Sequence, residues 1–156
     1  KKALKNFSGV QRRLTKVFKK DNIEFYDDYA HHPTEIKSVL EAVRKVAPKR
    51  KIITIFQPHR YSRVKSLNSE FASCFKASDQ MILCPVYSAG EVIDKKYNKT
   101  KFAKLISKSS KTQVVIIKDE LDLTKYLKKN LINDEIVIGM GAGSISKWMY
   151  GLKDNL

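Results

Sequence analysis

The sequence predicts an α/β fold, namely a Rossmann-like three-layer sandwich in which helices flank a mostly parallel β-sheet. Short runs rich in β-branched residues alternate along the chain with segments whose apolar residues recur about every 3.6 positions. The short runs are almost continuously apolar, as expected for parallel strands that are buried on both faces. At 156 residues and 42% hydrophobic content, the chain is long enough for one domain with a substantial core.

The alternation begins near residue 23 and continues to the end of the chain. The expected strands are Ile23–Tyr26, Ile52–Phe56, Met81–Val86, Val114–Ile117 and Ile136–Met140. The expected helices are Thr34–Val46, Ser62–Phe75, Thr100–Ser107, Leu121–Leu131 and Ser144–Leu152. Pro33 favours the start of the first helix, because proline lacks an amide hydrogen that the first turn would leave unused. The polar stretch Tyr87–Asn98 should be a long loop.

The first twenty residues do not fit this alternation. Lys1–Leu4 has the pattern of a helix end, Phe7-Ser8-Gly9 breaks it, and Val10–Lys20 is a basic segment. We interpret residues 1–6 as the remnant of a linker from a preceding domain and residues 7–156 as the domain itself. A frayed terminus is the alternative.

The net charge of +15 raises the question of a nucleic-acid partner. However, 25 of the 31 basic residues are lysines, and these are scattered as on a solvated surface: Lys37, Lys45, Lys65, Lys76, Lys104, Lys108, Lys125, Lys128 and Lys147. A nucleic-acid-binding face would interleave arginines with aromatic residues, so we expect no nucleic-acid partner. No apolar run approaches the ~20 residues of a membrane span, so we expect no membrane partner either. Two cysteines, Cys74 and Cys84, form neither a disulfide framework nor a metal motif, which favours the cytoplasm.

The unusual residues gather where the expected strands end. The carboxyl ends of parallel strands meet at one edge of a sheet, and ligands bind there. Four strands run into polar, aromatic or glycine-rich clusters, namely Asp27–Pro33, Gln57–Arg63, Pro85–Glu91 and Gly139–Ser144. The opposite edge carries little besides Lys, Asn and Asp. This asymmetry predicts a binding site at the carboxyl edge.

Each cluster allows more than one interpretation. Asp27-Asp28 can cap a helix, or a carboxylate there can hold ribose hydroxyls or a hydrated metal. His31-His32 is a poor metal pair, because adjacent side chains point in different directions. Arg60 and Arg63 lie one helical turn apart, so they can bind a carboxylate or phosphate, or form ordinary surface ion pairs.

The glycine-rich segment Gly139-x-Gly141-x-Gly143 is most simply a tight strand-to-helix turn. It follows the last strand, so no further βαβ unit comes after it to complete a dinucleotide site. The chain also contains no Gly-x-x-x-x-Gly-Lys-[Ser/Thr] loop. By itself it therefore cannot cradle ATP phosphates in the manner of a P-loop.

Taken together, four motifs resemble the carboxy-terminal domain of the Mur ligase family. They are Phe7-x-Gly9-Val10-x-Arg12-Arg13, Asp27-Asp28-Tyr29-Ala30-His31-His32-Pro33-Thr34-Glu35, Phe56-Gln57-Pro58-His59-Arg60-Tyr61-Ser62-Arg63 and Tyr87-Ser88-Ala89-Gly90-Glu91. They occur in the family's order and span essentially the whole chain. One departure is Ser144, where the family pattern has Asp.

The resemblance implies a three-domain, ATP-dependent amide ligase of peptidoglycan synthesis. One domain holds the UDP-sugar, a central ATPase domain holds ATP and Mg²⁺, and this third domain closes over both. The implied partners are L-alanine, UDP-N-acetylmuramic acid and ATP, together with the missing first and central domains. Residues 1–6 would then come from the central domain, and the third domain alone would be inactive.

The resemblance also implies roles for individual residues. Asp28 would contact the ATP ribose, Tyr29 and His31 would line the site near the amine, and His59, Arg60 and Arg63 would hold the alanine end. It implies no catalytic residue and no metal ligand in this domain. Two alternatives remain: the family member that recycles murein tripeptide, which typically has a Glu-Pro-Arg-Ser-Asn type sequence in place of Phe56–Arg63, and a non-catalytic α/β binding domain.

Overall fold

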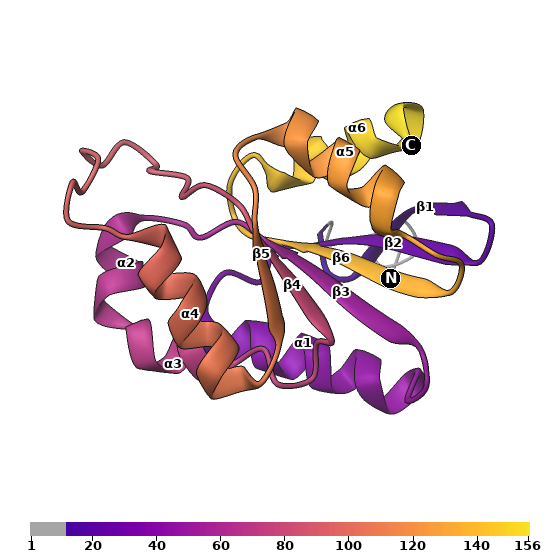
Figure 1. Ribbon diagram of the computed structural model, residues 1–156, viewed down its shortest axis with the longest axis horizontal. Coiled ribbons are helices and arrows are strands. Elements are labelled where there is room, and N and C mark those ends of the chain that lie inside the picture. Colours follow the sequence, from indigo (N-terminus) through magenta and orange to yellow (C-terminus); the bar gives the residue numbers. More distant parts are fainter. Residues whose placement is uncertain (1–11) are drawn as a thin grey trace, which may run out of the picture.

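A six-stranded sheet in the order β1-β2-β6-β3-β4-β5 forms the middle layer of the computed structural model, which describes residues 12–156 (Figure 1). The strands are β1 Thr15–Lys20, β2 Ile23–Asp28, β3 Lys51–Phe56, β4 Gln80–Leu83, β5 Gln113–Ile116 and β6 Glu135–Met140. All neighbours pair in parallel except β1, which is antiparallel to β2. The expected mostly parallel sheet is thus confirmed. The expected linker remnant at 1–6 and the break at 7–9 lie outside the described residues.

Helices cover both faces of the sheet, which completes the expected three layers (Figure 1). One face carries α1 Pro33–Val46, α2 Tyr61–Ser66, α3 Asn68–Ser73 and α4 Lys99–Ser110. The other face carries α5 Glu120–Asn130 and α6 Ile145–Asn155. Strand residues alternate between two apolar cores, so that Ile52 and Phe56 point toward α1 and α3 while Ile53 and Ile55 point toward α5 and α6.

The carboxyl ends of the central strands are aligned by hydrogen bonds that continue beyond the strands themselves. Strand β6, the last strand in chain order, lies between β2 and β3. Its extension is tied to both neighbours, because Gly141 N donates to Asp28 O (3.2 Å) and Gln57 N donates to Met140 O (3.0 Å). The segments that follow β2, β3 and β6 therefore start side by side, as a shared binding site requires.

Strand β1 is the main element that the sequence did not predict. Residues 15–20 lie within the segment interpreted only as basic, since Lys16, Lys19 and Lys20 obscure the strand pattern. Strand β1 is an edge strand, and lysines are common on edge strands because they discourage pairing with other chains. Phe18 supplies its apolar anchor by stacking on Phe25, with ring centroids 4.1 Å apart.

Several expected boundaries are wrong, and three of them lie next to the candidate site; the helices expected to end at Ser107 and Leu152 continue to Ser110 and Asn155. The single helix expected over Ser62–Phe75 is two short helices, α2 and α3, which meet at Leu67. The strand expected over Met81–Val86 ends at Leu83, just before Pro85, whose nitrogen cannot donate a ladder hydrogen bond. Finally, Asp27 and Asp28 lie inside β2 and not after it, because both pair with β6.

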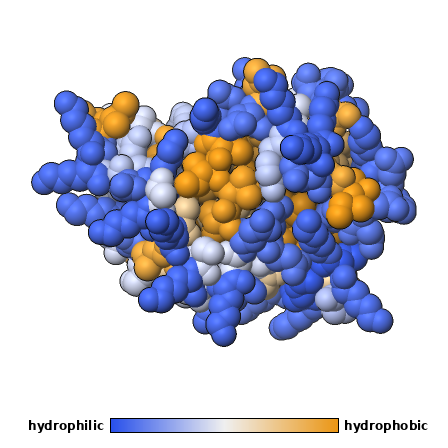
Figure 2. Space-filling model, in the orientation of Figure 1, coloured by the Kyte–Doolittle hydropathy of each residue, from blue (hydrophilic) through white to orange (hydrophobic). Residues whose placement is uncertain are grey.

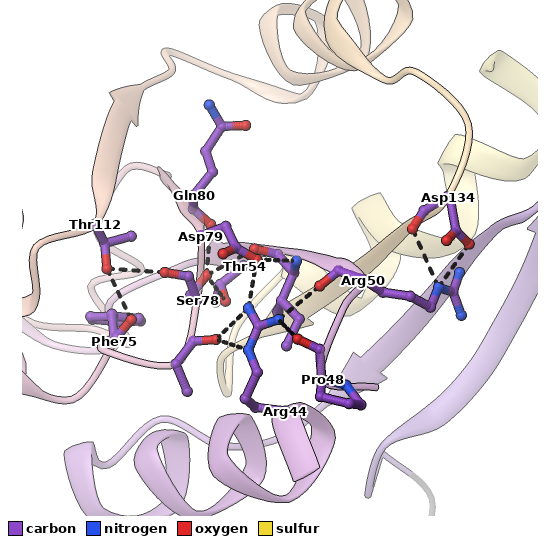
Figure 3. A network of polar contacts seen from close by, with 12 residues as sticks. Arg44, Pro48, Arg50, Thr54, Phe75, Ser78, Asp79, Gln80, Thr112 and Asp134 are labelled. Carbon is purple, nitrogen blue, oxygen red and sulfur yellow. Dashed lines mark hydrogen bonds and ion pairs between the residues drawn. The ribbon is translucent and has the colours of Figure 1, made fainter. Parts of the chain in front are cut away.

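The amino edge of the sheet is closed by a network of polar side chains (Figure 3). Ser78 Oγ lies 2.8 Å from Thr54 Oγ1, and Thr112 Oγ1 donates to the carbonyl oxygens of Phe75 (3.0 Å) and Ser78 (3.1 Å). Arg44 adds hydrogen bonds to three carbonyl groups and to the Asp79 carboxylate. These groups satisfy one another, so this edge offers few free donors to a ligand.

The lysines that were expected to form a solvated surface are all exposed. Figure 2 shows hydrophilic side chains over most of the visible face, with the largest apolar area near the middle of the view, where Figure 1 shows β5. Val114, Val115 and Ile116 of this edge strand are only half-buried. Within residues 12–156, none of the helices has the length and apolar character needed to cross a membrane.

Candidate substrate-binding site

Four aromatic side chains form a row along the carboxyl edge of the sheet. Tyr29 and His31 follow β2, His59 follows β3, and Tyr87 follows β4. The Tyr29 and His31 rings meet edge to face with centroids 5.1 Å apart, and the His31 and His59 rings do the same at 5.6 Å. The His59 and Tyr87 rings are stacked at 5.7 Å. The sheet thus unites residues from three separate motifs, and we call Tyr29, His31, His59 and Tyr87 the aromatic row.

The orientation of His31 is set by its own turn. Nδ1 of His31 lies 2.9 Å from the Tyr29 carbonyl oxygen, which can only accept a hydrogen bond. Nδ1 therefore carries a hydrogen, and Nε2 is the ring nitrogen left free to interact with a ligand. The Glu35 carboxylate lies 3.6 Å from Nδ1 and also accepts from the backbone nitrogens of His31 and His32. Burial raises the pKa of Glu35, but these N–H groups and the nearby cations outweigh it, so the net shift is downward and the group stays charged.

His59 has the opposite hydrogen arrangement because Arg63 lies beside it. Arg63 Nη1 is 3.2 Å from His59 Nδ1, and a guanidinium has only donors, so Nδ1 must accept. Nε2 of His59 then carries the hydrogen and can donate. Burial lowers the pKa of His59, and the neighbouring guanidinium of Arg63 lowers it further, followed by smaller contributions of His31 and Arg60. His59 is therefore neutral at pH 7, and the net positive charge at this point belongs to Arg63.

Arg60 is joined to the loop that carries Tyr87 through its backbone. Its backbone has φ 69°, a left-handed conformation that is unfavourable for a residue with a Cβ atom. The Arg60 nitrogen donates to Tyr87 O (2.9 Å), and Tyr87 N donates to Pro58 O (2.8 Å), which pins the two loops together. The exposed guanidinium has no hydrogen bond or ion pair within residues 12–156, so it is available to a ligand.

Asp28 is placed differently from the other predicted site residues. It is buried (1% exposed), and its two carboxylate oxygens accept from the backbone nitrogens of Leu14 (2.6 Å) and Ala30 (2.7 Å). These bonds shape the turn that delivers Tyr29 and His31. A contact between Asp28 and a ribose stays a prediction, and it would have to share oxygens that already have donors.

Arg12 is a further member of the site that was not among the predicted site residues. Its guanidinium carbon lies 4.8 Å from the centroid of the Tyr29 ring, in cation–π geometry, and Nε pairs with Asp27 Oδ2 at 3.2 Å. The clustering of Arg12 and Arg13 in the sequence is the signal that could have identified it. What the sequence could not show is that Arg12 lies beside Tyr29.

The glycine turn after β6 makes room for the aromatic row. A Cβ atom on Gly143 would lie 2.5 Å from Tyr87 Cγ and 2.6 Å from Gln57 Oε1. Gln57, which is buried, donates to Ser144 Oγ (3.0 Å) and accepts from Ile145 N (3.0 Å) at the start of α6. The turn is thus a packing feature, in which Gly143 allows Tyr87 to lie against the end of β6. This agrees with the simple turn expected from the sequence.

Comparison with known proteins assigns the chain to a family. A family model described as the glutamate ligase domain of Mur ligases matches residues 12–143. The chain belongs to this family. The matched region includes the aromatic row, Arg12, Arg63 and the glycine turn.

Relatives of this Mur ligase domain are found among curated proteins. It is 49% identical over 154 residues to UDP-N-acetylmuramate–L-alanine ligase of Pelagibacter ubique, covering 99% of the chain and 33% of that protein. It is 39% identical over 156 residues to the ligase of the same name from Bartonella tribocorum, again covering 33% of that protein. The chain therefore spans about a third of the length of the relatives it matches.

Solved structures agree with this assignment. The UDP-N-acetylmuramate–alanine ligase of Thermotoga maritima superposes with a TM-score of 0.74 at 27% identity, over 98% of this Mur ligase domain and 31% of that chain. A domain of a putative UDP-N-acetylmuramate:L-alanyl-gamma-D-glutamyl-diaminopimelate ligase from Haemophilus ducreyi has the same fold, with a TM-score of 0.66 at 18% identity. In that case the match covers 96% of the crystallised chain, so a domain of this size was crystallised separately from the rest of its enzyme.

Proposed function

We propose that this chain is the carboxy-terminal domain of an ATP-dependent ligase that joins L-alanine to UDP-N-acetylmuramic acid in the cytoplasm. Support comes from the 49% identity to the Pelagibacter ubique enzyme across the carboxy-terminal third of that protein. In this proposal the first and central domains bind the UDP-sugar, ATP and Mg²⁺, and this domain completes the amino-acid site. The isolated chain is inactive because it lacks those parts.

The observation that carries the proposal is the pairing of Arg63 with neutral His59 beside the aromatic row. An amino acid presents a carboxylate and an amine, so its site needs a fixed cation and a polar group of suitable orientation. Arg63 supplies a guanidinium, whose fork matches a carboxylate. His31, across the row, has its Nδ1 engaged with the Tyr29 carbonyl oxygen, which leaves Nε2 to interact with the amine.

The proposed reaction is nucleophilic substitution at an acyl phosphate. ATP phosphorylates the sugar carboxylate in the first step, releasing ADP. The alanine amine then attacks the acyl carbon, the tetrahedral intermediate expels phosphate, and the amine loses a proton. Arg63 and Arg60 hold the alanine carboxylate away from the reacting carbon, and fixed cations near the leaving phosphate stabilise its developing charge.

Mg²⁺ does not fit the described part of this domain. Within residues 12–156 no three His, Cys, Asp or Glu side chains come together as metal ligands, and the carboxylates of Asp27 and Asp28 are buried against protein donors. We therefore place Mg²⁺ in the central domain and route no step of this domain through it.

A chimera tests the proposal directly. The carboxy-terminal third of the Pelagibacter ubique ligase is replaced by this chain, and L-alanine-dependent phosphate release is measured in the presence of ATP and UDP-N-acetylmuramic acid. We expect activity with L-alanine in the chimera and none in the isolated chain. A folded chimera that releases no phosphate with L-alanine would contradict the proposal, as would ATP turnover by the chain alone.

A second chimera tests the alternative function. A murein peptide ligase from Psychrobacter arcticus shares the fold with a TM-score of 0.76, but its 18% identity supports the fold alone. If the chain came from a tripeptide-recycling enzyme, it would support ligation of the tripeptide Ala-Glu-diaminopimelate when joined to the first two domains of such a ligase. We expect that second chimera to be inactive with the tripeptide.

A further inference from the structure

One arginine outside the predicted site residues connects three separate pieces of the candidate site. Arg12 Nη2 donates to Gly141 O (2.5 Å), Nε donates to Asp27 Oδ2 (3.2 Å), and the guanidinium lies over the Tyr29 ring. In addition, the Arg12 carbonyl oxygen accepts from Tyr29 N (2.8 Å). A single side chain therefore joins the chain before β1 to β2, to the glycine turn and to the first ring of the aromatic row.

Asp27 explains why this position needs a cation. Its carboxylate is fully buried (0% exposed), and Oδ2 also accepts from Ser146 Oγ of α6 (2.6 Å). Oδ1 has no hydrogen-bond partner in the part of the chain that the structure describes. A buried carboxylate is costly unless a cation pairs with it, so the attraction of Asp27 holds the guanidinium in place.

The contacts of Arg12 affect both ends of the aromatic row. Arg12 contacts Tyr29 at one end and holds Gly141 in the turn whose Gly143 packs against Tyr87 at the other end. A lysine in its place could pair with Asp27, but its single ammonium could not also reach the carbonyl group and cover the ring. The geometry therefore uses the fork of an arginine and not merely its charge.

We propose that Arg12 is a positioning residue of the amino-acid site. Held by Asp27, it fixes Tyr29 and the glycine turn, and through them the two ends of the aromatic row. What the row binds rests on the proposed function above. The placement of Tyr29 is a property of this chain alone and is testable without any ligand.

The first test follows the rings by NMR in the isolated chain. Arg12→Lys should shift the ring resonances of Tyr29 and His31, since the guanidinium no longer covers the Tyr29 ring. Ser146→Ala is the matched control, because it removes the other donor to Asp27 Oδ2 without touching Tyr29 or the turn. Unchanged Tyr29 resonances in Arg12→Lys, or equal shifts in both variants, would overturn the proposal.

A second variant guards against simple unfolding. If Arg12→Lys does not fold, Arg12→Gln combined with Asp27→Asn replaces the buried ion pair by a neutral one, so no buried charge is left unpaired. The double variant should fold and still show the Tyr29 shift. A folded double variant with native Tyr29 and His31 resonances would equally overturn the proposal.

The second test is kinetic and uses the active chimera. Arg12→Lys should raise KM for L-alanine about tenfold, while kcat and KM for ATP change less than about threefold, because the placement of a binding group is disturbed and not the reacting atoms. Ser146→Ala should lower Tm without raising KM for L-alanine. An unchanged KM for L-alanine in Arg12→Lys would overturn the role of Arg12. An inactive chimera with unmodified Arg12 would instead contradict the proposed function. In that case the NMR test would still decide whether Arg12 positions Tyr29.

Discussion

Arg44 at the amino edge and Arg60 and Arg63 at the carboxyl edge are used in contrasting ways, whereas Arg12, also at the carboxyl edge, is paired within the protein. At the amino edge, Arg44 donates to the carbonyl oxygens of Pro48, Arg50 and Ala77 and to the Asp79 carboxylate (Figure 3). At the carboxyl edge, Arg63 has a histidine nitrogen as its partner, and Arg60 has no side-chain partner among residues 12–156. Donors that are satisfied within the protein contribute to stability, and donors that are left over can bind a ligand. This difference shows that the number of free hydrogen-bond donors at an edge indicates a binding site better than the number of arginines there does.

The backbone differs in the same direction. At the carboxyl edge, Arg60, Ala89, Gly90 and Gly141 all have positive φ angles, and the loops there are held by single hydrogen bonds between neighbours. At the amino edge, buried hydroxyl groups of Ser78 and Thr112 bond directly to the backbone. Positive φ angles also occur at the amino edge, at Asp21 and Lys111, but there they belong to a hairpin turn and a helix end and not to a segment that carries a predicted site residue. Each prediction below tests this division between a stabilising edge and a binding edge.

The largest expected effect comes from removing one arginine at each edge. In the active chimera, Arg63→Ala should lower kcat/KM for L-alanine by about ten- to over a hundredfold, since a hydrogen bond to a charged group is worth roughly 1.5–3 kcal/mol. Arg63→Lys should recover only part of this loss in kcat/KM, because one ammonium group cannot form a bidentate contact with the carboxylate. Arg44→Ala should leave kcat/KM unchanged and lower the free energy of unfolding.

Titration of both substrates decides how Arg63 acts. A loss confined to ATP, with the L-alanine dependence unchanged, would reject alanine binding and assign Arg63 to the phosphate side of the cleft. A loss of stability in Arg63→Ala as large as that in Arg44→Ala would break the division between the edges.

The next effect concerns stability at the amino edge. Thr112→Val keeps the side-chain shape but removes the donor to the carbonyl oxygens of Phe75 and Ser78, and leaving such buried groups unsatisfied costs about 1–3 kcal/mol. Chemical denaturation of the isolated chain measures this loss. Thr112→Ser, which retains the hydroxyl, is the control and should lose less than half as much. Equal losses in the two variants would show that packing of the methyl group matters and not the hydrogen bonds.

The features that the sequence predicts correctly are those that depend on local patterns along the chain. The parallel strands, the order of the helices and the gathering of Tyr29, His31, His59 and Arg63 at one edge were predicted, because periodicity and strand ends are local signals. Strand β1 was missed because its lysines hide a strand that gains its stability from pairing with β2.

The contacts that give individual residues their roles are long-range and were not predictable. Arg12 is 129 positions from Gly141, and Thr112 is 37 positions from Phe75, so no local pattern links them. The burial of Asp28 was also hidden, since a pair of aspartates after an apolar run suggests exposed ligands. Here, β2 simply continues through both of them.

A smaller effect is expected from pH. Lys16 and Arg50 hydrogen-bond to Glu24 at the start of β2 and lower its pKa to about 2. A carboxyl whose pKa is lower in the folded state contributes stability that is present above its usual pKa of 4.5 and is lost as the pH falls toward 2. Glu24→Gln should therefore flatten the loss of stability between pH 4.5 and 2, as followed by thermal unfolding. An identical pH profile for the variant would contradict this role.

The binding edge contributes its own, separate pH response. The pKa of His59 is lowered, chiefly by burial and then by Arg63, so the unfolded chain binds the proton more tightly. Stability from this source is present above the usual pKa of 6.5 and declines as the pH falls below it. In His59→Gln this first decline should disappear, while the Glu24 decline at lower pH should remain.

The smallest effect compares two residues with positive φ angles but different ψ angles, 34° at Lys111 and 133° at Arg60. Lys111, which ends α4, has φ 55°, and Arg60 has φ 69°. Glycine relieves the strain of a left-handed residue but loses more entropy on folding, so each glycine variant should gain about 0.5–1 kcal/mol. Lys111→Gly should do so with unchanged activity in the chimera, since a helix end is a position that glycine favours. Arg60→Gly should also gain stability but raise KM for L-alanine, because its guanidinium is exposed and is unpaired within residues 12–156. If Arg60→Gly were as active as Lys111→Gly, the strain at Arg60 would have no connection with binding, and Arg63 alone would supply the cation of the site.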